Sequence, residues 1–126
     1  MQYIGVDYGT KRVGIAISDE EGSFAFPKGI VPTSDAIGYI ETLVKTGAIS
    51  GIVVGESLAT NGEENDVLFM TKSFAKKLAA VVSVPIVFER EGFSSVEAHR
   101  YQTKKGNRDD SAAAVILQRF LDKRQK

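Results

Sequence analysis

The stretch that decides the fold runs from Tyr3 to Asp19 and reads YIGVDYGTKRVGIAISD. Its first part, Tyr3 to Val6, is a short apolar run, and the turn-forming pair Gly9-Thr10 follows. The second apolar run, Val13 to Ile17, is mostly β-branched and therefore predicts a strand. Asp7 stands where the first run meets the turn. We therefore expect two strands, with a carboxylate at the end of the first.

Length and composition favour one domain covering residues 1–126, because 126 residues with 43% hydrophobic content suffice for one core. The chain has no cysteine, which excludes a disulfide scaffold and a thiolate metal site. Lys and Arg number 16, as do Asp and Glu, so any signal for nucleic-acid binding must be local. No leader-like segment or membrane-length apolar run is present, and we expect a cytoplasmic protein with no membrane partner.

The hydrophobic pattern predicts three further strands and four helices. The strands cover residues 23–31, 49–55 and 84–88, and the helices cover residues 34–47, 67–78, 94–103 and 112–121. Pro27 places the first of these strands at a sheet edge. Ser34 or Asp35 is expected to cap the first helix, and residues 109–111 the last. The order βββαβαβαα predicts an α/β fold, with helices packed on a five-stranded mixed sheet.

Four carboxylates are predicted to converge at one rim of this sheet. Asp7 and Glu56 end neighbouring strands, Glu91 follows the next strand, and Asp110 stands in the first turn of the last helix. Crowded like charges repel unless a cation neutralises them, and oxygen ligands select Mg²⁺ or Mn²⁺. We therefore predict that the four acids are metal ligands and catalytic residues of a two-metal site that hydrolyses phosphodiesters. Each acid alone also fits an ordinary strand end or a helix cap.

Basic residues near these acids are candidates for contacts with nucleic-acid phosphates. They form one group beside Asp7 and a second group before the last helix: Thr10, Lys11 and Arg12, then Lys104, Lys105 and Arg108. Solvated surface charge is the alternative interpretation of both groups.

With these residues in place, the chain resembles the YqgF family, also called RuvX, over nearly its whole length. The matching motifs are residues 7–14 (DYGTKRVG), residues 53–55 with Asn61-Gly62 and Glu64, residues 94–98 (SSVEA) and residues 110–115 (DSAAAV). The resemblance implies an RNase H-like fold and a metal-dependent nuclease that matures the 5′ end of pre-16S rRNA. The family was named earlier for its similarity to Holliday junction resolvases. Asp7, Glu91 and Asp110 match its acidic positions.

The chain also departs from the family pattern. Arg90 and Gly92 stand where the family has Asp and Arg, and Glu56-Ser57 replaces an apolar residue and a proline. Asn61 replaces an aspartate. Position in the sheet favours Glu56 as the metal-binding glutamate, whereas the resemblance favours Glu91, and both stay open.

Three other functions remain open from the sequence. One is a Holliday junction resolvase acting on branched DNA. Another is a nucleic-acid-binding assembly factor without catalysis, which the altered motif around Glu91 would explain. The segment Asp7–Thr10 is also similar to the phosphate loop of actin-like ATPases and sugar kinases, but those proteins close two such domains over a nucleotide. For the nuclease we expect structured RNA, such as pre-16S rRNA, or branched DNA as partner, and a monomer or weak dimer.

Overall fold

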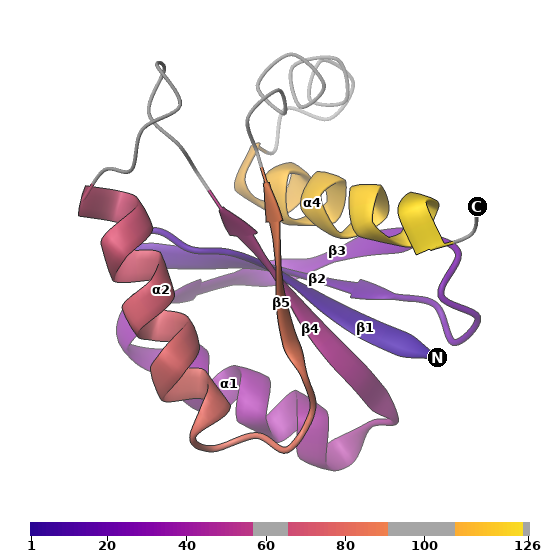
Figure 1. The fold of residues 1–126 in the computed structure, drawn as a ribbon, viewed down its shortest axis with the longest axis horizontal. Helices are drawn as coiled ribbons and strands as arrows, with labels where there is room; N and C mark the ends of the chain where they lie inside the picture. Colours follow the sequence, from indigo (N-terminus) through magenta and orange to yellow (C-terminus); the bar gives the residue numbers. More distant parts are fainter. Residues whose placement is uncertain (57–65, 91–107, 125–126) are drawn as a thin grey trace.

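The computed structural model describes residues 1–56, 66–90 and 108–124, and at residues 66–67, 90 and 108–111 it describes the backbone alone. A five-stranded sheet lies between two helical layers (Figure 1). The strands are β1 (Gln2–Asp7), β2 (Arg12–Ser18), β3 (Ala25–Pro32), β4 (Ile49–Glu56) and β5 (Ile86–Arg90), and the helices are α1 (Thr33–Thr46), α2 (Asp66–Ala79) and α4 (Arg108–Arg124).

The strand order in the sheet is β3-β2-β1-β4-β5. The first three strands form an antiparallel meander, and β4 and β5 add to it in parallel with β1. The predicted five-stranded mixed sheet is therefore confirmed. Pro27 lies in β3 and pairs with Ala16 of β2. Strand β3 is at the edge of the sheet, as the proline predicts.

Each face of the sheet has its own apolar core, because successive strand residues point to opposite faces. On the face covered by α1 and α2, Ile4, Val6 and Val54 are buried together. On the face covered by α4, Val53 packs with Leu117. Figure 1 shows α1 and α2 on one side of the sheet and α4 on the other. None of the helices in the described ranges is both long and apolar enough to cross a membrane.

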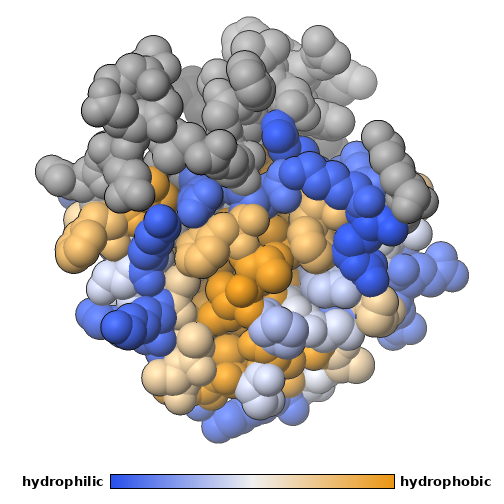
Figure 2. All heavy atoms as spheres, in the orientation of Figure 1, coloured by the Kyte–Doolittle hydropathy of each residue, from blue (hydrophilic) through white to orange (hydrophobic). Residues whose placement is uncertain are grey.

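The outer strand β5 leaves apolar side chains accessible. Val87 and Phe88 are each about two-fifths exposed. Figure 2 shows the molecule in the orientation of Figure 1, with hydrophobic residues gathered in the middle of the visible face and hydrophilic residues around them.

Two predicted helix starts are wrong, and the predicted helix at residues 94–103 lies outside the described residues. Helix α1 begins at Thr33, after Pro32, whose side chain has no hydrogen-bond acceptor and therefore cannot cap it. The backbone N–H of Thr33 donates to Lys11 O (3.0 Å). Helix α4 begins at Arg108, so residues 109–111 belong to the helix instead of capping it, and Asp110 lies in the first turn as predicted. Acidic residues at that end are favourable because they face the positive pole of the helix dipole.

Small residues let α4 lie close to β1. A side chain built at Gly5 would place its Cβ 2.7 Å from Leu117 Cβ and 2.9 Å from the carbonyl oxygen of Ala113. Ala113 itself is fully buried. Gly5 and Ala113 together therefore allow α4 to lie close to β1.

Replacing Gly5 with Ala should destabilise the protein by about 1–3 kcal/mol, because the added methyl group must displace α4. Gly38→Ala is the matched control, since this exposed helical position has nothing within 4 Å of its added Cβ. Loss of a flexible glycine there should stabilise the fold by about 0.5–1 kcal/mol. Urea denaturation of both variants measures these changes. Equal stabilities would contradict the close packing of α4 on β1.

Candidate active site

The ends of three parallel strands form one rim of the sheet. Val6 pairs with Val54 in the parallel register of β1 and β4, so Asp7 and Glu56 both end their strands at this rim. Glu56 in turn pairs with Arg90, the last residue of β5. Asp7 and Glu56 are both half-buried. Two of the four predicted acids thus stand on neighbouring strand ends.

The register places these two acids on different faces of the sheet. Gly5 faces α4, and Asp7, two residues further along β1, shares that face. Glu56 follows Val54 at the same spacing, on the face covered by α1 and α2. Its Oε2 lies 3.9 Å from Nζ of Lys72 on α2. The two carboxylates therefore approach the rim from opposite faces.

The direction of α4 brings its first turn to the end of β1. Near the start of β1, the rings of Tyr3 and Phe120 lie 5.2 Å apart. One step further along, Gly5 lies against Ala113 and Leu117. The helix therefore runs antiparallel to β1, and its backbone at Asp110, one turn before Ala113, lies beside the strand end. Of the other predicted residues, Glu91, Lys104 and Lys105 lie outside the described residues, and Arg108 is the first residue of α4.

The turn between β1 and β2 presents two basic residues at the rim. A Cβ on Gly9 would lie 2.4 Å from Arg12 O, so the turn requires glycine there. Thr33 holds this turn through its hydroxyl, which donates to Gly9 O (2.7 Å). The side chains of Lys11 and Arg12 are exposed, as is that of Thr10. The start of α1 thus fixes the backbone that carries the predicted phosphate-binding residues.

A buried acid that the sequence interpretation missed ties α4 to the sheet. Glu89 on β5 is only 4% exposed and pairs in register with Gly55. Its Oε2 accepts a hydrogen bond from Lys123 Nζ (2.6 Å) and lies 3.6 Å from Arg119 Nε, both on α4. The only sequence signal was its position two residues after Val87, because residues at this spacing in a strand point to the same face of the sheet. Its burial depends on how α4 packs.

Gln118 anchors α4 at the opposite edge of the sheet. Its amide nitrogen donates to Ser23 O and its amide oxygen accepts the backbone N–H of Ala25, both at 2.9 Å. Ser23 lies in the connection into β3 and Ala25 is the first residue of that strand. In the connection, the Asp19 carboxylate accepts the backbone N–H groups of Ser23 (2.7 Å) and Phe24 (3.2 Å). Those hydrogen bonds lower the pKa of Asp19. With Glu89 on one side and Gln118 on the other, α4 is fixed across the sheet.

The chemistry of the rim fits a divalent cation. Asp7 offers a carboxylate at the end of a central strand, and α4 adds the backbone position of Asp110 beside it. Hard oxygen donors of this kind suit Mg²⁺ or Mn²⁺. Within the described parts of the chain, no group of three or more His, Cys, Asp or Glu side chains is arranged to hold a metal ion.

Solved structures with a similar architecture include two proteins described by their relation to Holliday junctions. Thermus thermophilus RuvC in complex with a Holliday junction substrate superposes with a TM-score of 0.67 at 13% identity, over 99% of this chain and 96% of that one. The fowlpox virus Holliday junction resolvase gives 0.55 at 13% identity, over 98% and 99% of the two chains. The fold is RNase H-like, and the family match and the relatives' names given next define the protein as a nuclease of this fold.

The sequence comparisons narrow this class to one family. The family model described as "RuvX: Holliday junction resolvase" matches residues 1–123. A relative from Oleidesulfovibrio alaskensis is 33% identical over 97% of this chain and 92% of its own length. Another from Sulfurihydrogenibium is 36% identical over 95% and 89%. Both carry the provisional name pre-16S rRNA nuclease. The chain belongs to the RuvX family.

Replacing Glu89 with Gln should lower the free energy of unfolding by about 2 kcal/mol, because it removes the charge on a buried carboxylate that accepts a hydrogen bond from the largely exposed Lys123. Glu41→Gln is the control, since Glu41 pairs with Lys45 on the exposed surface of α1 (3.2 Å) and should cost less than about 0.5 kcal/mol. Thermal and urea denaturation report both values. A Glu89 variant as stable as the Glu41 variant would show that the contacts of Glu89 with Lys123 and Arg119 do not hold α4.

Proposed function

We propose that the protein is a metal-dependent endonuclease that hydrolyses phosphodiester bonds in the 5′-end maturation of pre-16S rRNA. The observation that carries the proposal is the placement of Asp7 at the end of β1, beside the first turn of α4 and its Asp110. The relatives are named as nucleases of pre-16S rRNA, which supports RNA as the substrate. In this proposal the protein acts in the cytoplasm as a monomer or weak dimer.

The proposed metal ligands are Asp7 and Asp110, with Glu91 or Glu56 completing the set. Bound Mg²⁺ or Mn²⁺ supplies a Lewis acid that activates water and neutralises charge on the phosphate. The carboxylates of Asp7 and Asp110 would hold the cation at the rim. Lys11 and Arg12 bind phosphates of the substrate strand from the exposed turn next to Asp7.

The remaining proposed nucleic-acid contacts come from Thr10 in that turn and from Lys104, Lys105 and Arg108 before and at the start of α4. A formal net charge of zero means that binding relies on these local groups. Affinity should therefore fall as salt rises, in proportion to the few phosphates they neutralise.

A second candidate function is Holliday junction resolution. It is favoured by the description of the matching family as junction resolvases. The chemistry at Asp7 would be the same for both functions, and the substrate would differ.

Replacing Asp7 with Asn should reduce cleavage at least about a hundredfold with Mg²⁺ or Mn²⁺, because it removes a metal-binding carboxylate without changing side-chain size. The assay offers a structured RNA with the pre-16S 5′ region and a four-way DNA junction. Asp35→Asn, at an exposed position in the first turn of α1, is the control and should cleave normally. Full metal-dependent activity of the Asp7 variant would refute the proposal. Whether the wild type cleaves the RNA or the DNA junction distinguishes rRNA maturation from junction resolution.

The two glutamates can be separated with Glu56→Gln and Glu91→Gln. If Glu56 is a metal ligand, its loss should raise the Mn²⁺ concentration needed for half-maximal cleavage at least about tenfold. If its role is the ion pair with Lys72, Lys72→Met should have the same effect as Glu56→Gln and leave the metal requirement unchanged. A metal requirement raised by Glu91→Gln alone would assign the site to Asp7, Asp110 and Glu91.

A further inference from the structure

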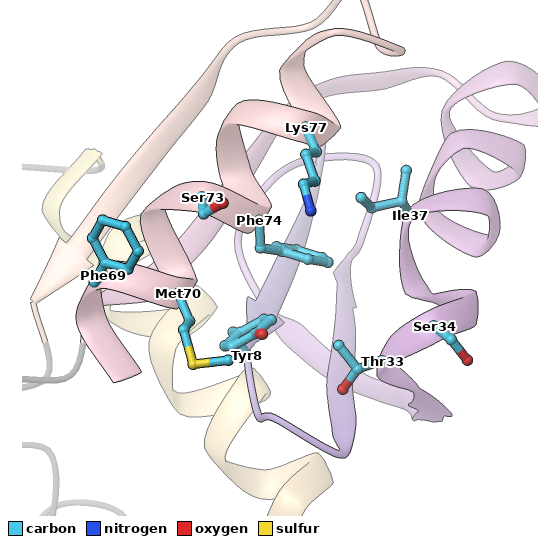
Figure 3. A pocket seen from close by; sticks show the side chains of 9 residues that line it. All are labelled: Tyr8, Thr33, Ser34, Ile37, Phe69, Met70, Ser73, Phe74 and Lys77. Carbon is cyan, nitrogen blue, oxygen red and sulfur yellow. The ribbon is translucent and has the colours of Figure 1, made fainter. Parts of the chain in front are cut away.

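A pocket with a volume of about 350 Å³ opens between α1 and α2, beside the end of β1 (Figure 3). Tyr8 and Phe74 form its aromatic wall, with ring centroids 5.0 Å apart and planes inclined at 47°. Met70 extends toward Tyr8 at one side (Figure 3). Pockets that hold whole small molecules start at about 300 Å³. This pocket therefore suits a ligand of one or two rings rather than a polypeptide segment.

The pocket also offers a positive charge. The amino group of Lys77 points into the space in front of Phe74, and Thr33 lies on the opposite side (Figure 3). The Thr33 hydroxyl is already committed to Gly9 O, at 2.7 Å. The charged group over an aromatic wall favours a ligand that combines a planar ring with an anion.

Phe69 lies at the outer rim of the pocket, further from Tyr8 than Met70 is (Figure 3). Its side chain is 73% exposed, and Met70, the next residue on α2, is 39% exposed. Both line the pocket. An aromatic ring left in solvent at the mouth of a pocket is positioned to stack on a ligand as it enters.

The pocket begins one residue from the proposed metal ligand. Tyr8 directly follows Asp7, and its packing against Phe74 places it on the face covered by α1 and α2. A nucleic-acid strand whose cleaved phosphate lies at Asp7 therefore needs only to pass over the sheet rim to reach Tyr8. Unpaired bases of RNA are recognised mainly by stacking on aromatic side chains.

We propose that this pocket binds an unpaired nucleotide next to the cleaved bond, with its base packed between Tyr8 and Met70, its phosphate at Lys77, and Phe69 contacting it from the outer rim of the pocket. This inference rests on the proposed nuclease function. The pocket would make cleavage depend on a base that is not paired in a helix. It would thereby favour substrates in which the cleaved bond lies next to single-stranded nucleotides.

The test measures binding of a fluorescently labelled five-nucleotide single-stranded RNA by anisotropy, with chelator present so that no cleavage occurs. Phe69→Ala and Lys77→Ala should each weaken binding about fivefold or more. About fivefold corresponds to the smallest loss expected when one base–aromatic contact is removed. Phe69→Tyr should keep the wild-type affinity because it keeps the ring. The controls are Phe24→Ala, at a ring 62% exposed near β3, and Lys76→Ala on α2.

A 5-bromouracil base in the same RNA locates the site after irradiation. The proposal expects cross-links in peptides that contain Tyr8 or Phe69. Unchanged affinity of both pocket variants, or cross-links confined to other peptides, would overturn the pocket while leaving any observed cleavage intact. Weakened binding with no cleavage by the wild type would overturn the nuclease proposal and retain the pocket as a nucleotide site.

Discussion

The fold depends on the close contact between α4 and β1. Gly5 has no room for a side chain, because Leu117 and the carbonyl of Ala113 occupy the space where its Cβ would be. A helix held this close to the central strand brings the start of α4 to the strand's end. The proposed chemistry depends on that contact, because Asp7 and Asp110 are far apart in the sequence and only the packing of α4 on β1 brings their elements together.

Two polar contacts keep α4 from sliding or rotating over the sheet. Glu89 holds it at the β5 edge through Lys123 and Arg119, and Gln118 holds it at the β3 edge. A buried carboxylate is costly unless paired, so the Glu89 contact penalises any other placement of the helix. Gln118 lies away from the rim, whereas Glu89 stands one residue before the end of β5. Both residues contribute to the site by fixing the element that carries Asp110.

The sequence predicted the sheet because its signals are local. Apolar runs, a proline and the turns around Gly9 defined the strands, and right-handed crossovers placed β4 and β5 beside β1. The helix starts at Thr33 and Arg108 were mispredicted because capping patterns do not report where a backbone N–H finds its partner. For α1 that partner is Lys11 O, distant in sequence. Glu89 was missed for a related reason, since its burial arises from packing against α4. The opposite facing of Asp7 and Glu56 follows from the pairing register, which the hydrophobic runs alone do not specify.

The measurement that tests the account most directly is Mn²⁺ titration followed by loss of backbone amide signals in NMR spectra. If Asp7 and Asp110 share one metal site, amides at the end of β1 and in the first turn of α4 should broaden together at the same Mn²⁺ concentration. Both sets of signals should be restored by Asp7→Asn. Broadening at only one of the two elements, or broadening that survives in the Asp7 variant, would contradict the claim that the packing of α4 on β1 assembles the active site.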